Sequence, residues 1–175
     1  MKFSQPLVLR GNYTLTHLGS KSGDNRNVYF YAGVDDGGAG YDLTINYTGD
    51  YNNRAFYLGS GSDYSGKTII HGSTLALNGT LASTSEVMVD RQGTFQIYWD
   101  AAGTDNRLDN AIPIRLRGGQ LSAYAAQGAS AQWLGSDTVG TVTLDYGYSS
   151  IAAGGNRARV DLTLTNLARN NGSMV

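Results

Sequence analysis

The chain has 175 residues, enough for one domain with a sizeable core, and its formal net charge of −1 provides no electrostatic footprint for nucleic acid or an anionic membrane. It contains 24 glycines, 12 tyrosines and only two prolines, a glycine share about twice the usual one. Cysteine is absent, which excludes disulfides and thiolate metal sites and suits a secreted bacterial protein that must stay unfolded during export.

Short segments of alternating apolar residues follow one another along the chain, separated by glycine-rich turns. The alternation has period two, which places every second side chain on one face of a strand. Strands are therefore predicted at Pro6–Leu9, Tyr13–Leu18, Val28–Ala32, Tyr41–Tyr47, Ala55–Leu58, Lys67–His71, Thr74–Leu77, Glu86–Asp90, Thr94–Tyr98, Ile112–Leu116, Gln120–Tyr124, Thr141–Leu144, Ser149–Ile151 and Arg159–Leu164. The prediction is an all-β fold in a single domain over residues 1–175.

One local template returns along the chain: an alternating apolar pair, a short gap that ends in glycine, and a second alternating pair. The central glycines of the successive copies are Gly72, Gly93, Gly119, Gly147 and Gly172. The interval from each to the next lies within the range of one solenoid coil. A β-sandwich would need hairpins, and classical Asn-Gly or Asp-Gly hairpin turns are nearly absent.

Glycine permits the sharp bend at the corner of a β-helix, so the template fits a corner better than a hairpin. Coils of about 20–26 residues would give roughly seven to eight rungs. The pattern therefore favours a right-handed parallel β-helix, a solenoid of roughly seven to eight coils, over the sandwich.

Residues 64–77, YSGKTIIHGSTLAL, resemble the autotransporter-associated β-strand repeat, also called the passenger strand-loop-strand repeat. The positions of its signature are occupied here by Tyr64, Ser65, Gly66, Thr68, Ile70, Gly72 and Leu75, with one extra residue, Ser73. Segments 109–121, 140–144 and 167–172 are similar to later parts of the same unit. The resemblance extends over most of the chain, is strongest over 55–125 and is weak before position 40.

The resemblance implies a β-helix exported to the surface or exterior of a bacterium, in a stalk or passenger without catalytic residues of its own. The chain stops in mid-coil after Gly172, and its first residues lack the apolar stretch of a signal peptide. A bare solenoid end exposes unpaired backbone groups. We therefore expect either a fragment of a larger chain or a subunit that stacks end to end into filaments.

A partial metal motif lies at 37–42, GGAGYD, directly after Asp35 and Asp36. It matches the first six positions of the calcium β-roll nonapeptide, with Asp42 at the acidic position. A β-roll site takes its ligands from adjacent repeats, and only one copy is present. The prediction is a glycine-rich turn with no metal and no cofactor; calcium held by Asp35, Asp36 and Asp42 is the alternative.

Catalysis by a polysaccharide-active β-helical enzyme would need clustered carboxylates. Glu86 and Asp90 flank one strand without an evident partner, and His17 and His71 lie far apart in the sequence. No catalytic residue is therefore proposed, and the chain is predicted not to be an enzyme.

Tyrosines concentrate in the first third of the chain, among them Tyr29 and Tyr31. They would form either a face that stacks on sugars or contacts a host surface, or ladders between coils. The prediction is a structural protein of the bacterial cell surface or extracellular matrix that self-associates through its ends, without nucleic acid and without membrane insertion of this segment. The first alternative is an adhesin or carbohydrate-binding passenger, and the second is a β-helical polysaccharide-active enzyme.

Overall fold

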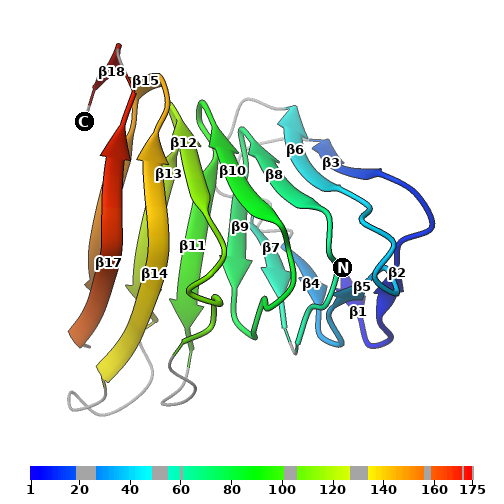
Figure 1. Ribbon diagram of the computed structural model, residues 1–175. Helices are drawn as coiled ribbons and strands as arrows, with labels where there is room; N and C mark the ends of the chain where they lie inside the picture. The colour runs from blue at the N-terminus through cyan, green and yellow to red at the C-terminus, as the bar shows by residue number, and fades with distance from the viewer. Residues whose placement is uncertain are drawn as a thin grey trace.

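The structure, a computed structural model, describes residues 1–18, 27–48, 55–59, 61–100, 106–126, 134–155, 159–170 and 172–174. Within these ranges the elements are strands only, and every pair of strands is parallel. Figure 1 shows two layers of strands stacked along one axis, with the N-terminal strands at one end and the C-terminal strands at the other.

Two sheets of seven strands form the layers. Sheet I contains β1 (Lys2–Phe3), β4 (Val28–Phe30), β7 (Ala55–Leu58), β9 (Thr74–Leu77), β11 (Thr94–Trp99), β13 (Gln120–Ala125) and β16 (Ser150–Gly155). Sheet II contains β3 (Tyr13–Leu18), β6 (Leu43–Thr48), β8 (Lys67–His71), β10 (Glu86–Asp90), β12 (Ile114–Arg117), β14 (Leu134–Leu144) and β17 (Arg159–Arg169). Two short pairs complete the walls: β2 (Leu7–Val8) with β5 (Val34–Asp35), and β15 (Gly147–Tyr148) with β18 (Ser173–Met174).

Each turn of the chain adds one strand to sheet I and one to sheet II, so neighbouring strands in a sheet come from consecutive turns. The prediction of an all-β parallel solenoid is confirmed. The predicted seven to eight coils are too many. Each sheet has seven strands, but in the described residues the third wall is paired over only five successive turns, from β2 through β5, Ser62 and Leu81 to Leu108, so the solenoid has about five full turns. The turns are also less uniform in length than predicted. The stretch of chain from Thr68 to its sheet partner Val87 is much shorter than the stretch from Leu15 to Ile45.

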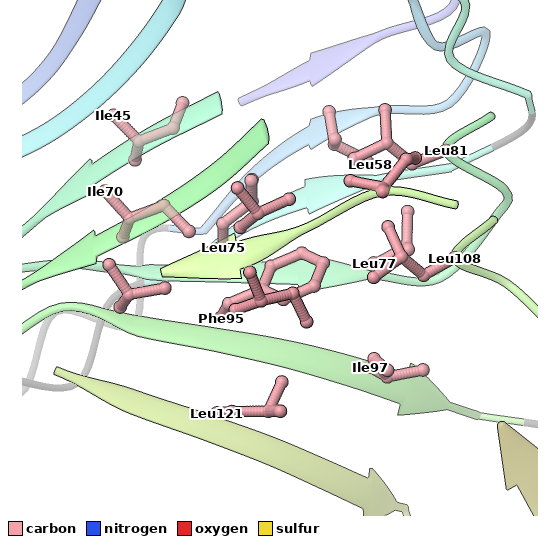
Figure 2. Close-up of a cluster of buried hydrophobic side chains, with 14 of the residues drawn as sticks. Ile45, Leu58, Ile70, Leu75, Leu77, Leu81, Phe95, Ile97, Leu108 and Leu121 are labelled. Atoms are coloured by element: carbon pink, nitrogen blue, oxygen red, sulfur yellow. The ribbon is translucent and has the colours of Figure 1, made fainter. Parts of the chain in front are cut away.

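The core fills the space between the two sheets with apolar side chains that repeat from turn to turn. Leu75, Phe95 and Leu121 occupy the same position of β9, β11 and β13 and are fully buried. Figure 2 shows these three side chains in one column, beside Leu77 and Ile97, which are also paired in register. Every second strand residue points into this core, because parallel in-register stacking keeps a row of side chains on one face.

The link from sheet II to sheet I is a tight corner. Gly72 separates β8 from β9, which belong to different sheets, so it lies at a corner and not in a hairpin, as predicted. Gly72 and Gly118 have φ of 60° and 83°, a region that favours glycine. In the turn between them the same corner position is held by Gln92, with φ of 65°.

Candidate functional surfaces

The Tyr-Ser-Gly segment at 64–66 is a buried plug at the corner before β8. Tyr64 is fully buried, and its hydroxyl shares a hydrogen bond with the Thr68 hydroxyl. Thr68 is in turn 3.0 Å from the Thr84 hydroxyl, which donates to the Gly66 carbonyl at 2.6 Å. Burial raises the pKa of Tyr64 well above its ordinary value, although the bonds to Thr68 and Thr84 act in the opposite direction. The polar members of the segment therefore satisfy one another inside the solenoid.

Asp36 holds the corner of the next turn in place. Its carboxylate accepts hydrogen bonds from the backbone amides of Gly38 and Tyr41, each at 2.9 Å, and of Ser65 at 3.1 Å. The Ser65 hydroxyl donates to the same carboxylate at 3.1 Å. Burial raises the pKa of Asp36, but these bonds to Ser65, Tyr41 and Gly38 together outweigh burial and leave it below its ordinary value.

Each of the three carboxylates of the calcium alternative accepts hydrogen bonds from backbone amides. Asp35 accepts from the Gly37 amide at 2.9 Å, and Asp42 accepts from the Lys67 amide at 2.8 Å. Among the described residues no group of three His, Cys, Asp or Glu side chains is placed to hold a metal ion. The calcium alternative stays a prediction, and these contacts support the glycine-rich turn.

The predicted central glycines occupy different positions at the corners. A Cβ at Gly93 would lie 2.6 Å from the Ile70 carbonyl oxygen, and one at Gly119 would lie 2.6 Å from Val89 Cγ1. Both glycines follow the left-handed corner position, so a side chain there is excluded by the previous turn. Gly147 and Gly172 have φ of 77° and 87° and lie at β15 and next to β18.

Tyrosines form a continuous ladder on the outer face of sheet I. Tyr29 stacks on Tyr57 with ring centroids 4.7 Å apart, and on Tyr31 at 5.6 Å. Tyr57 meets Tyr98 edge-on at 5.4 Å, and Tyr98 stacks on Tyr124 at 6.1 Å. Tyr29 therefore has neighbouring rings at both 4.7 and 5.6 Å, so it offers little free ring surface to a sugar.

The ladder also closes the outer face of β9. Ala76 points outward between Leu75 and Leu77 but is fully buried, while Tyr57 and Tyr98 from the strands on either side are in ring contact. Desolvation by burial raises the pKa of Tyr57 to about 12, with smaller contributions from Tyr98, Tyr29 and Asp100. This geometry supports the interpretation of the tyrosines as ladders between coils.

Alternating charges cross the outer face of sheet II. Glu86 lies between Lys67, at 3.4 Å, and Arg115, at 2.9 Å. Asp90 lies between His71, at 2.7 Å, and Arg117, at 3.5 Å. The sequence reading that Glu86 and Asp90 lack evident partners was wrong, because each partner lies on a neighbouring turn and is distant along the chain.

A groove of about 800 Å³ runs along three consecutive corners at the C-terminal half of the solenoid, and we call it the corner groove. The longer side chains among its lining residues are Arg91, Gln92, Arg117, Gln120, Tyr146 and Tyr148. The Arg117 guanidinium lies 5.0 Å from the centre of the Tyr146 ring. Sequence reasoning missed this groove, because its three segments belong to three different turns and their glycines, Gly93, Gly119 and Gly147, indicated only corners.

Comparisons of the chain with protein-family models, curated proteins and solved structures gave no match. The described part of the chain contains no helix long and apolar enough to span a membrane. The resemblance to the autotransporter-associated repeat therefore remains a prediction from the residues that carry it.

Proposed function

We propose that this chain is a non-enzymatic structural β-solenoid of the bacterial cell surface or extracellular matrix, which extends end to end into filaments. The observation that carries the proposal is that the rows of core side chains are exposed to solvent at both ends of the solenoid. Phe3 stacks on buried Phe30 with ring centroids 5.1 Å apart, but is itself 39% exposed. At the other end Leu167 continues the column of buried Val142 and is 53% exposed.

The backbone at the two ends supports the same interpretation. Among the described strands, β1 and β3 at one end, and β16 and β17 at the other, each have a neighbour on one side only within their sheets. Such edges present unpaired N–H and C=O groups that another strand can pair with. β17 is the longest of these edge strands and spans Arg159–Arg169, an extended template for pairing.

A second copy of this chain is the occupant that fits such an end. The strands of both seven-stranded sheets run parallel, so the C-terminal edge of one copy offers the surface on which the first turn of another would continue. A head-to-tail contact of this kind does not close on itself, and it generates a linear filament. The absence of cysteine suits the proposed extracellular setting, because an exported bacterial chain must stay unfolded until it has crossed the membrane.

The proposal that the chain is not an enzyme rests on the ion pairs that its acidic side chains make on sheet II. On sheet II the carboxylates of Glu86 and Asp90 face basic side chains from the neighbouring turns. A carboxylate paired in this way on both sides is poorly suited to exchange protons with a substrate. An adhesin or carbohydrate-binding role is the second candidate, and the corner groove is the observation that favours it.

Sedimentation velocity and electron microscopy over a concentration series test the filament. The expected result is reversible, concentration-dependent growth of linear particles. Phe3→Lys and Leu167→Lys should each reduce growth, because a charge at an edge opposes strand pairing. Ala82→Lys, at an exposed position on the side of a middle turn, should leave it unchanged. A strictly monomeric wild-type particle at millimolar concentration would contradict the proposal.

A further inference from the structure

The corner groove has one arginine in its wall, Arg91, that no described carboxylate neutralises. Arg91 is exposed and makes no ion pair with any described residue, and Arg117 reaches the groove from the end of β12. Arg117 Nε is 3.5 Å from Asp90 and 3.9 Å from Asp145. None of the described residues that line the groove is acidic, so Arg91 is left without a counter-charge there. An anionic group is the partner that this wall lacks.

The groove also offers aromatic surface that the tyrosine ladder does not. Tyr148 is 68% exposed and has no ring contact with any described residue. Tyr146 is 48% exposed and has the Arg117 guanidinium near its ring. A free tyrosine face packs against the C–H groups on one face of a sugar ring and leaves its hydroxyl for a polar contact.

Gln92 is a strained residue at the same place. Its φ of 65° is a left-handed conformation, and the corresponding corner positions of the neighbouring turns are Gly72 and Gly118. Glycine adopts this conformation at a lower energetic cost than glutamine does. The glutamine side chain is therefore expected to have a role of its own. Gln92 and Gln120 each provide an amide that donates and accepts hydrogen bonds.

We propose that the corner groove binds an acidic oligosaccharide with uronate residues. Tyr148 takes a sugar ring, Arg91 takes a carboxylate, and the two glutamine amides take hydroxyls. The groove runs across consecutive turns, so successive sugars along the solenoid axis meet successive corners. This site does not depend on filament formation.

Isothermal titration calorimetry with tetragalacturonate, and with cellotetraose as the neutral control, tests the proposal. We expect saturable binding of the acidic sugar at one site per chain, and at least about tenfold weaker binding of the neutral sugar. The affinity for tetragalacturonate should fall as salt is added, because salt screens exposed charges. No binding of tetragalacturonate at millimolar concentration, or equal binding of the two sugars, would overturn it. Equal binding of poly-glutamate would also overturn it, since any flexible polyanion would then suffice.

Arg91→Gln and Tyr148→Ala are expected to weaken tetragalacturonate binding by about tenfold or more each, because each removes one contact from an exposed position. The matched controls are Arg10→Gln and Tyr31→Ala, an exposed arginine and tyrosine outside the groove. Equal losses in the controls would show non-specific attraction and sink the proposal. Arg91→Gln should leave filament growth unchanged, so failure of binding and failure of assembly are separable outcomes.

Discussion

Gly66 lies where one turn of the chain touches the turn before it. A Cβ at this position would lie 2.1 Å from the Tyr41 carbonyl oxygen, a contact that backbone atoms cannot relieve locally. Gly66→Ala is therefore expected to lower the free energy of unfolding by about 2 kcal/mol or more, measured by urea denaturation. Gly154→Ala is the control: a Cβ there meets nothing within 4 Å, so its effect should stay within about 0.5 kcal/mol. Equal effects would contradict the close packing of the corner.

Asp36 is the residue at which pH should act on stability. Its pKa in the folded chain is below the ordinary 3.8, so the ionised carboxylate stabilises the fold above about pH 4, and this contribution is lost as pH falls through the folded pKa. Asp36→Asn should lower the free energy of unfolding by about 1–2 kcal/mol at neutral pH, since it removes charge-assisted hydrogen bonds.

The same substitution should flatten the fall of stability in acid, as followed by urea midpoints from neutral pH down to about pH 3. Asp161→Asn, at a more exposed carboxylate paired with Arg159, provides the control. A variant that loses stability equally at every pH would show that ionisation of Asp36 is not the cause.

At the scale of elements, the tyrosine ladder adds side-chain contacts between neighbouring strands of sheet I, which are otherwise joined by backbone hydrogen bonds. Tyr57 contacts Tyr29 on one side and Tyr98 on the other. Tyr57→Ala should therefore cost about 2 kcal/mol, because it removes two ring contacts and uncovers Ala76. Tyr31→Ala, at the exposed end of the ladder, should cost about half as much or less. Equal losses in thermal or urea unfolding would contradict a ladder that acts between turns.

The charged rows of sheet II contribute less per residue than the tyrosines do. Their side chains are partly exposed, with 40% for Arg115 and 46% for Lys67, and exposed ion pairs each add at most about 1 kcal/mol. Their more definite effect is on register, because a shift of β10 by two residues against β8 would place Glu86 or Asp90 opposite Ile69 in place of a basic side chain.

At the scale of the whole molecule, each turn contacts only its neighbours. Stability in such a stack is carried by the interfaces between turns, and the terminal turns have only one. Amide hydrogen exchange at low protein concentration should therefore be slowest in β10 and its neighbours and faster in β1, β3 and β17. Exchange in the terminal strands should slow when filaments form. Uniform protection along a monomeric chain would contradict a stack of coupled turns.

The strands were predictable because their signal is local. The alternation of Val87 and Val89 in β10, and of Phe95 and Ile97 in β11, is read within a single short segment, and a glycine between two such segments indicates a bend. The buried plug of Tyr64, Thr68 and Gly66 is also contained in one short segment, although Thr84 completes it from the next turn.

Only the tertiary structure determined which residues of neighbouring turns face each other. The number of turns, the ion pairs of Glu86 and Asp90, the stacking of Tyr29 on Tyr57 and the corner groove all depend on register between segments of different turns. The length of each connection sets that register, and these lengths vary from turn to turn. The sequence by itself therefore determined a parallel, glycine-cornered solenoid, because strand alternation and corner bending are properties of neighbouring residues. The surfaces depend on distant residues being brought into line by the winding of the chain.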